Sequence, residues 1–428
     1  MSLKVLVVGS GGRENAIAWK ISQSKNLDKL YCLPGNPGTA SFATNIAAGV
    51  GDFEAIAAAV ADGGIDLVVV GPENPLVDGL TDFLKARFPQ LLVVGPGKTG
   101  AQLEGSKEFA KDFMSRHGIP TAAYRPFTKE TLAEAKAFMK TLQPPYVLKA
   151  DGLAAGKGVV ILDDYYAACA ELEEMFSGKF GAASSKVVIE QFLSGIEVSV
   201  FVLTDGKDYL ILPEAKDYKR IGDGDTGLNT GGMGAVSPVP FADKVFMQKV
   251  EERIVKPTIA GLAADNIDYK GFIFIGLMNC GGDPYVIEYN VRMGDPETES
   301  VMTRISSDLL LHLEAAAKGE LKNQKIEISP EAAVTVVIVS GGYPGSYGKG
   351  FPITGIDKAE ADGATVFHMG TKAAEEGVVT SGGRVLAVVA NAPDIVQAGR
   401  KAYAAAANID FKDAYHRSDI TKDLLKYL

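Results

Sequence analysis

Short apolar runs alternate with helical segments through the first hundred residues of this 428-residue chain, and each run stops at glycine or proline. This alternation is typical of βαβ units, which build a parallel sheet. Loops at the carboxyl ends of parallel strands form the ligand-binding edge of such a sheet. We therefore predict an α/β, Rossmann-like N-terminal domain over residues 1–102. Its expected strands are Leu3–Val8, Leu30–Leu33, Asp66–Val70 and Leu91–Val94, with a helix at Arg13–Gln23.

The pattern changes after residue 102. We predict a multidomain chain in which an α+β central domain (103–324) contains a small lobe at about 121–189, and a small α+β C-terminal domain (325–428) follows. The expected helices are Glu108–Arg116, Asp164–Phe176, Lys244–Ala264, Glu297–Lys318 and Asp394–Ala407. The expected strands are Tyr146–Lys149, Val159–Leu162, Val187–Phe192, Val334–Val339 and Val385–Ala390, with a hairpin at Gly271–Arg292.

Composition excludes several classes of partner. The formal charge of −10 argues against a nucleic-acid binder, which would carry a basic face. No apolar stretch approaches the roughly 20 residues that span a bilayer, and no signal-peptide pattern opens the chain. The three cysteines (Cys32, Cys169 and Cys280) lie far apart and offer neither a disulfide framework nor a zinc spacing. We expect a cytoplasmic protein with small-molecule partners, no nucleic-acid or membrane partner, and a monomer rather than an oligomer.

The glycine cluster at Gly9–Glu14 joins the first strand to the first helix, so the N–H groups at the helix start can face an anion. A dinucleotide is disfavoured because Glu14 breaks the G-x-G-x-x-G spacing and the second strand ends at Leu33-Pro34 without a ribose-binding acid. A phosphate monoester is the better ligand. A tight turn with no ligand is the alternative.

The segment Lys149–Gly158 resembles a P-loop, but Gly152 and Gly156 are one residue too close and Gly158 replaces the magnesium-binding Ser or Thr. A β-branched run follows in place of a helix, so we expect the loop to join two strands. Its backbone can fold over a polyphosphate while Lys149 and Lys157 supply positive charge. A plain hairpin turn is the alternative, although such a turn seldom needs three glycines and two lysines.

Two further loops carry candidate groups. Glu190–Glu197 leaves the 121–189 lobe, so its backbone could bind a base and Glu197 could bind ribose hydroxyls; an ordinary edge strand and turn is the alternative. Asp217–Gly234 is rich in glycine and aspartate. An EF-hand is excluded because Leu228 takes the glycine position and Gly234 that of the bidentate glutamate. A mobile substrate loop or a solvated surface loop remains.

The segment Val286–Arg292 is strand-like, so its side chains alternate between two faces. A carboxylate, an amide oxygen and a guanidinium then point together, which suits magnesium and the phosphates it bridges. The next residues, Gly294–Thr298, turn the chain into a helix nearby. A solvated strand face is the alternative. One face is predicted to hold Val286, Glu288, Asn290 and Arg292, and the other Ile287, Tyr289 and Val291.

Lys149–Gly158 and Glu288–Arg292 together resemble the ATP-grasp superfamily, in which two α+β lobes hold ATP between them. Further motifs narrow this match, because their order and distances resemble those of the glycinamide ribonucleotide synthetases, also called phosphoribosylamine–glycine ligases. Any one motif is weak, but the ordered set is specific and covers essentially the whole chain. The motifs are Gly11–Glu14, Gly71–Glu73, Gly105–Lys107, Ala150–Gly158, Asn229–Gly234, Gly294–Thr298, Gly341–Pro344 and Gly382–Val385.

The resemblance implies ATP-grasp central domains, with the 121–189 lobe as a lid, and a reaction of purine biosynthesis. ATP, with Mg²⁺ (or Mn²⁺), would phosphorylate the carboxylate of glycine. The amine of 5-phosphoribosylamine would then attack the glycyl phosphate, giving glycinamide ribonucleotide, ADP and phosphate. Such chemistry needs positioning and charge neutralisation rather than a His or Cys nucleophile.

The family's functional residues carry over to the matching positions of this chain. ATP would be bound by Lys107, Lys149, Gly152, Gly156, Lys157, Gly158, Glu190, Phe192 and Glu197, and the metal ion by Glu288 and Asn290. Catalytic roles would fall to Arg292, Asp295 and Asp217. The substrates would be bound by Gly11, Gly12, Arg13, Glu14, Gly38, Pro72, Glu73, Asn229, Thr230, Gly231, Gly232 and Met233.

Two positions depart from the family pattern. Asn15 stands where His usually follows Arg-Glu, which removes a titratable group, and Lys216 stands where Gln often precedes Asp-Tyr-Lys-Arg, which adds a charge. Three other functions are considered: a ligase for a different acid and amine, a nucleotide-binding sensor, and a dehydrogenase. A sensor would be expected to lack the metal ligands, yet Glu288 and Asn290 are both present.

Overall fold

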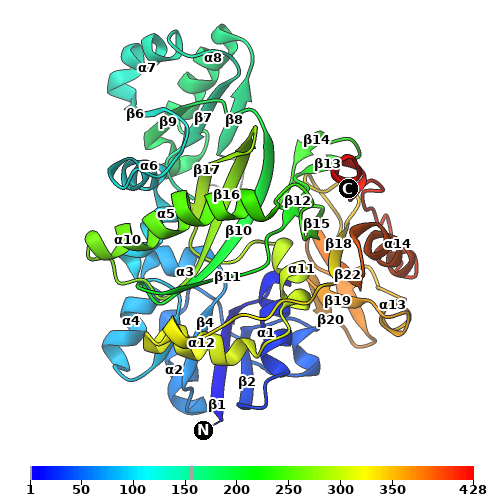
Figure 1. Cartoon of the computed structure of the whole chain (residues 1–428). Coiled ribbons are helices and arrows are strands. Elements are labelled where there is room, and N and C mark those ends of the chain that lie inside the picture. Colours follow the sequence, from blue (N-terminus) through cyan, green and yellow to red (C-terminus); the bar gives the residue numbers. More distant parts are fainter. Residues whose placement is uncertain (1, 154–157) are drawn as a thin grey trace.

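The computed structural model describes residues 2–153 and 158–428 (Figure 1). A central antiparallel sheet separates the N-terminal parallel sheet from a small outer lobe, and the C-terminal sheet lies to one side (Figure 1). The predicted mixed α/β, multidomain architecture is confirmed. Within the described ranges, no helix is long and apolar enough to cross a bilayer.

The N-terminal sheet is parallel, with strand order β3-β2-β1-β4-β5, as the βαβ pattern predicted. Residues 5–8 of β1 are wholly buried because helices cover both faces of the sheet, which explains their continuous apolar run. The strands are β1 (Leu3–Gly9), β2 (Leu27–Pro34), β3 (Thr44–Asn45), β4 (Leu67–Val70) and β5 (Leu92–Val94). The helices are α1 (Gly12–Ser22), α2 (Phe53–Gly63), α3 (Glu73–Asp78), α4 (Leu80–Arg87) and α5 (Lys98–Gly105).

The outer lobe is a four-stranded antiparallel sheet, of order β6-β9-β7-β8, packed against two helices. It has an apolar core of its own, which includes Phe127, Leu148 and Leu172. Strands β7 and β8 pair across the glycine-rich loop, so the predicted strand–loop–strand arrangement is confirmed. After α6 (Lys107–Arg116), the elements are β6 (Tyr124–Thr128), α7 (Leu132–Met139), β7 (Tyr146–Ala150), β8 (Val159–Leu162), α8 (Tyr165–Phe176) and β9 (Lys186–Gln191).

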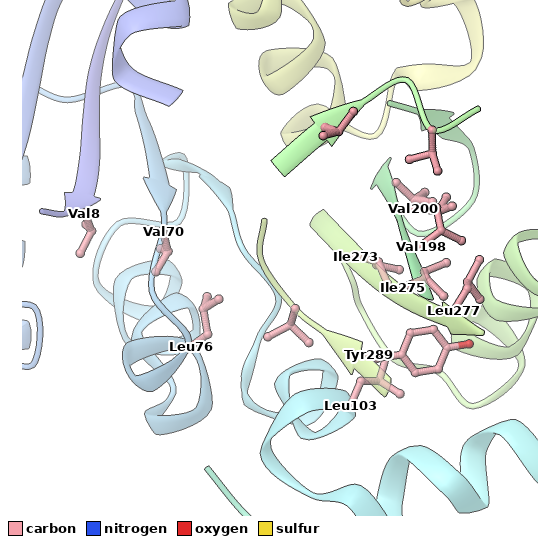
Figure 2. Packing of buried hydrophobic residues seen from close by; sticks show 14 of the residues in the cluster. Val8, Val70, Leu76, Leu103, Val198, Val200, Ile273, Ile275, Leu277 and Tyr289 are labelled. Carbon is pink, nitrogen blue, oxygen red and sulfur yellow. The ribbon is translucent and has the colours of Figure 1, made fainter. Parts of the chain in front are cut away.

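The central sheet has the order β11-β10-β16-β17 and its strands are antiparallel. Apolar side chains of β10, β16 and β17, among them Val198, Ile273 and Tyr289, lie close together (Figure 2). The Tyr289 hydroxyl also forms a 2.6 Å hydrogen bond with the Thr258 hydroxyl of α10. The elements are β10 (Ile196–Thr204), β11 (Tyr209–Ile211), α9 (Lys244–Val250), α10 (Lys256–Ala264), β16 (Gly271–Cys280), β17 (Asp283–Asn290), α11 (Glu297–Arg304) and α12 (Leu309–Lys318).

The single helix predicted for Glu297–Lys318 is wrong, because the structure has two helices there, α11 and α12. Between them Ile305 is extended and pairs with Ile328, while Ser306 donates its N–H to the Glu327 carbonyl. The Asp308 carboxylate then accepts the N–H of Leu310 and caps α12. Pairing with a distant segment therefore interrupts the helix. The predicted helix Lys244–Ala264, by contrast, is continuous through a π turn at Glu251–Val255.

The C-terminal sheet takes strands from both sides of residue 324. Its order is β12-β15-β18-β22-β19, and β12 and β15 come from the glycine-rich segment Asp217–Gly234 and its flanks. That segment is therefore attached to the C-terminal sheet. The elements are β12 (Lys216–Asp217), β13 (Arg220–Gly222), β14 (Thr226–Asn229), β15 (Gly234–Ser237), β18 (Ala332–Val339), α13 (Ile356–Ala361), β19 (Thr365–His368), β20 (Thr371–Ala373), β21 (Val378–Thr380), β22 (Arg384–Ala392) and α14 (Ile395–Ala406).

Candidate active site

A β-bulge in β17 decides which side chains face the site. Gly276 of β16 pairs with Glu288, but the next residue, Leu277, pairs with Val286, so Ile287 is the extra residue of the bulge. The alternation shifts by one at this point. Val286 is fully buried in the core and Ile287 lines the same cleft as Glu288, so our prediction for the faces of Val286 and Ile287 is wrong.

Four cations act electrostatically on the Glu288 carboxylate. Burial opposes its ionisation, but the positive charges of Lys219, Lys149, Lys107 and Arg292 outweigh burial and hold the pKa of Glu288 below its ordinary value. The carboxylate is therefore ionised at neutral pH. Glu288 lies half-buried on β17, where a small cleft is lined by Glu197, Val198, Ser199, Lys219, Phe274, Gly276, Leu277, Ile287 and Glu288.

Lys219 is a site residue that sequence reasoning missed. Its ammonium contacts the Glu197 carboxylate and lies in the cleft beside Glu288. These charges, together with Asp217, raise the pKa of Lys219 despite its desolvation. Lys219 belongs to the Asp217–Gly234 segment, which the sequence analysis named as a candidate loop. Nothing in the neighbouring residues showed that its side chain would reach Glu197 on β10.

The predicted nucleotide residues Lys149 and Glu190 lie on the neighbouring strands β7 and β9. Lys149 Nζ lies 3.0 Å from Glu190 Oε2 and donates to the Ile287 carbonyl over 3.2 Å. Lys111 Nζ, from α6, lies 2.9 Å from the same Glu190 oxygen, and burial lowers the pKa of Lys111 to about 8 although Glu190 opposes this. All three side chains are buried. Lys111 was not predicted.

The glycine-rich loop is anchored at its first residues. Lys107 Nζ donates to the Gly152 carbonyl over 3.0 Å, and the Asp151 carboxylate accepts the N–H of Glu108 at the start of α6. At the other end, the Gly158 carbonyl accepts the N–H of Ala150 over 2.8 Å. The predicted residues Gly156 and Lys157 lie outside the described residues. Phe192 is half-buried in the loop between β9 and β10.

Arg292 follows β17 and lies between two acids, Glu73 of α3 and Glu104 of α5. Its Nη2 is 2.8 Å from Glu104 Oε1 and 3.3 Å from Asn290 Oδ1, and its Nε is 3.4 Å from Glu73 Oε2. Glu104 is buried on α5, and its other oxygen accepts the N–H of Val291 over 2.8 Å. Sequence reasoning missed Glu104, because it stands 188 residues from Arg292 along the chain.

The Gly9–Glu14 loop lies at the same junction. The Glu14 carboxylate accepts the N–H of Gly11 over 2.8 Å. The Glu14 side chain packs so closely on Gly9 and Gly71 that a Cβ added at either glycine would lie within 2.3 Å of one of its atoms. Glu14 thus supports the loop from within. Arg13 contacts Glu14, and its Nη1 lies 3.8 Å from Glu73 Oε2. Glu73, whose neighbour Pro72 precedes α3, therefore lies between Arg13 and Arg292.

Asp295 connects this loop to the C-terminal domain. Its Oδ2 accepts the N–H of Arg13 over 3.3 Å, and its Oδ1 lies 3.0 Å from Arg384 Nη1. Asp217 is half-buried on β12, where burial raises the pKa of its carboxyl group against the attraction of Lys219. The predicted catalytic residues thus lie on two separate segments: Arg292 and Asp295 between β17 and α11, and Asp217 on β12.

The Asn229–Met233 loop changes from exposed to buried along its length. Asn229 is exposed at the end of β14, whereas Met233 is fully buried and donates its N–H to the Tyr218 carbonyl over 2.7 Å. Thr230 donates both its N–H and its hydroxyl to the Lys219 carbonyl. The loop backbone is therefore fixed to the segment that carries Asp217.

The donors near Glu288 fit a magnesium or manganese ion. Glu288 offers an ionised carboxylate and Asn290 an amide oxygen on the same strand, which are the hard oxygen ligands these ions prefer. Residues 2–153 and 158–428 contain no cluster of three or more His, Cys, Asp and Glu that could form a closed metal cage. A two-ligand site is what Mg²⁺ uses when phosphates and waters complete its coordination.

The departure at Asn15 has a structural counterpart. Asn15 Oδ1 accepts the N–H of His368 on β19 over 2.7 Å, and a Cβ at Gly38 would lie only 2.3 Å from the same oxygen. Asn36 also donates to the His368 carbonyl over 2.8 Å. Asn15, Gly38 and His368 therefore join the N-terminal and C-terminal domains.

This junction predicts a dependence of stability on pH. Burial lowers the pKa of His368 to about 4 from an ordinary 6.5. Between these values the unfolded chain binds a proton that the folded chain does not, so the free energy of unfolding decreases as the pH falls from 6.5 to 4. Glutamine does not titrate, so we expect the free energy of unfolding of His368→Gln to fall by about 3 kcal/mol less than that of the parent protein between pH 6.5 and pH 4. Urea unfolding at the two pH values measures this difference. Equal losses in the two proteins would contradict this.

The chain matches known proteins along nearly its whole length. Three domain descriptions of phosphoribosylglycinamide synthetase match it: the N domain at residues 3–104, the ATP-grasp (A) domain at 105–298 and the C domain at 333–423. Phosphoribosylamine–glycine ligases of Agrobacterium fabrum and Rhizobium meliloti are 47% and 48% identical, each over 98% of both chains.

Solved structures agree with these matches. The crystal structure of phosphoribosylamine–glycine ligase from Thermotoga maritima is 35% identical, with a TM-score of 0.86 over 97% of this chain and 100% of that one. A biotin carboxylase of Campylobacter jejuni is 16% identical, with a TM-score of 0.71 over 99% of this chain and 94% of that one. At this identity the match shows a similar fold and nothing more.

Proposed function

Because the chain belongs to the phosphoribosylglycinamide synthetase family, we propose that it uses ATP to join the carboxylate of glycine to the amine of 5-phosphoribosylamine. The products are glycinamide ribonucleotide, ADP and phosphate, and the reaction is a step of purine biosynthesis. A ligase of this superfamily needs a nucleotide site and an acceptor site that meet where the phosphoryl group is transferred.

One observation carries this proposal: Arg292 connects the two halves of the site. On one side it contacts Asn290, which shares β17 with Glu288, the carboxylate on which the lysines act. On the other side it contacts Glu73, which also lies near Arg13 of the first loop. A guanidinium at this position can contact the transferred phosphoryl group while the ribosyl phosphate occupies the N-terminal loop. This arrangement supports a ligase over a dehydrogenase, which would require a dinucleotide at that loop.

The proposed mechanism proceeds in two steps. A carboxylate oxygen of glycine attacks the γ-phosphorus of ATP, the bond to the β-γ bridging oxygen breaks, and glycyl phosphate and ADP form. The amine nitrogen of 5-phosphoribosylamine then attacks the glycyl carbon, phosphate leaves with its oxygen, and the nitrogen loses a proton. Lys107, Lys149, Lys219 and Arg292 neutralise the phosphate oxygens, and water is excluded so that the acyl phosphate survives.

The remaining roles are proposed as follows. Glu190, Phe192 and Glu197 bind the adenosine part of ATP, and the Gly9–Glu14 loop with Gly38 binds the ribosyl phosphate. Asp217, Asp295 and the Asn229–Met233 loop border the two small substrates. Glu288 and Asn290 would hold Mg²⁺, or Mn²⁺, which polarises the phosphate oxygens when bound. Nothing in this scheme requires a second subunit or a membrane, and we propose a cytoplasmic monomer.

The proposal is tested by measuring ADP release with a panel of acids and amines. We expect release to depend on both glycine and 5-phosphoribosylamine, and mass spectrometry to detect glycinamide ribonucleotide in amounts equal to ADP. Release with a different acid or amine would assign the chain to another ligase reaction. Nucleotide binding without turnover of any pair would identify a sensor instead.

We also predict that the outer lobe closes over ATP, because mobile backbone must cover the nucleotide to exclude water. The lobe has its own core, so it is expected to move as a unit about its connections to α6 and β10. Amide exchange of residues 121–153 and 158–189 should slow when ATP and Mg²⁺ bind. Equal protection with and without the nucleotide would refute closure.

A further inference from the structure

Two motifs of the C-terminal domain, Gly341–Pro344 and Gly382–Val385, were singled out in the sequence but have no part in the scheme above. The structure brings them together, because Ser340 donates its N–H to the Gly383 carbonyl over 2.8 Å. The Tyr343 ring packs closely against Gly383, where a Cβ added to the glycine would lie 2.2 Å from a ring carbon. Their side chains Tyr343 and Arg384 then reach the same residue of the central segment, Gly231.

Tyr343 and Arg384 bind both polar groups of the Gly231 backbone. The Gly231 N–H donates to the Tyr343 hydroxyl over 2.9 Å, and Arg384 Nη1 donates to the Gly231 carbonyl over 2.7 Å. A Cβ at Gly231 would lie 2.9 Å from Arg384 Cζ, so a larger residue would displace the guanidinium. An exposed glycine whose N–H and carbonyl are both bound by side chains of another domain has lost the freedom that a surface loop ordinarily has.

The same guanidinium connects this loop to the Asp295 turn. Arg384 Nη1 donates to the Asp295 carbonyl over 2.8 Å and lies 3.0 Å from Asp295 Oδ1. The two segments also touch directly, since a Cβ at Gly232, whose φ is +117°, would lie 2.4 Å from Pro296 Cδ. Burial opposes the charge of Arg384, but Asp295, Glu299 and Glu297 keep its pKa above the ordinary value, so the guanidinium stays charged.

We propose that Tyr343 and Arg384 are positioning residues that hold the Asn229–Met233 loop against the Asp295 turn in the geometry that binds the two small substrates. Through them the C-terminal domain controls affinity for glycine and 5-phosphoribosylamine without affecting the ATP half of the site. The inference rests on the proposed function, because the loop and the turn were assigned there to the substrates. Neither side chain needs to touch a reacting atom.

The test compares Tyr343→Phe, which removes only one hydroxyl, with Tyr347→Phe four residues later. The Tyr347 ring lies 6.2 Å from that of Tyr343, and its hydroxyl makes no hydrogen bond to any residue that the structure describes. For Tyr343→Phe we expect KM for glycine to rise about tenfold, with KM for ATP and the thermal midpoint unchanged. Tyr347→Phe should match the parent protein. Amide exchange of Gly231 should also accelerate in Tyr343→Phe alone.

A second variant keeps the inference testable if one hydroxyl has a small effect. Arg384→Lys retains the charge but loses the planar fork, and we expect KM for both small substrates to rise about 50-fold with unchanged ATP binding. A merely structural role would lower the thermal midpoint and the fraction of active protein and leave each KM unaltered. That result, or unaltered exchange at Gly231, would overturn the inference. If ADP release by the parent protein does not depend on glycine, the proposed function fails. Amide exchange of Gly231 then still tests whether Tyr343 holds the loop.

Discussion

Replacing Glu288 by alanine is expected to lower kcat about a thousandfold, with little loss of folding. The carboxylate is the one ionised ligand of the proposed metal ion, so its removal leaves the phosphate charge of ATP poorly neutralised. Within the described ranges no hydrogen bond and no ion pair holds the Glu288 side chain, which is half-buried. The free energy of unfolding should therefore change by less than about 1 kcal/mol. Steady-state kinetics and urea unfolding measure the two effects separately.

A matched control for this variant lies on the same strand. Asp283 begins β17 and forms exposed ion pairs with Lys249 and Arg253, so Asp283→Ala removes the same kind of group away from the site. We expect it to keep nearly full activity. If Glu288→Ala retains turnover at saturating Mg²⁺, the metal site has been assigned to the wrong strand face.

Replacing Arg292 by alanine is expected to reduce kcat by a similar factor, about a thousandfold, and to destabilise the fold as well. The guanidinium is the charge partner of Glu104, which is 8% exposed and whose pKa burial already raises. Without Arg292 a buried carboxylate loses its counter-charge, which costs about 3 kcal/mol of unfolding free energy. Combined kinetics and urea unfolding report both losses.

A double variant separates catalysis from stability. Glu104→Gln in the Arg292→Ala background removes the unpaired charge, so we expect it to recover a large part of the lost stability and none of the lost activity. Arg253→Ala, at an exposed ion pair, serves as the control and should cost less than about 1 kcal/mol. Recovery of activity in the double variant would show that Arg292 acts through folding rather than at the phosphoryl group.

Much of the fold was predictable because its signals are local. The buried strands of the parallel sheet, such as β1 and β4, are continuous apolar runs in the sequence, and each run is followed by a glycine. The sequence predicted one helix over Glu297–Lys318 where the structure has two, because the apolar residues keep a helical spacing across the break. Ser306-Ser307-Asp308 was a capping signal for the second helix. The bulge at Ile287 had no local signal, since it depends on how β16 pairs with β17.

The sequence by itself determined which chemical groups this protein possesses and which short segments present them: the glycine loops, the lysines beside them, and the carboxylate and amide of β17. Only the tertiary structure decided which groups meet. Glu104 reaches Arg292 from α5, Lys219 contacts Glu197 in the cleft that Glu288 also lines, and two C-terminal side chains bind Gly231. The reason is physical: spacing along a strand or helix fixes neighbours within a few residues, whereas contacts between distant segments depend on how the buried faces of different sheets pack together.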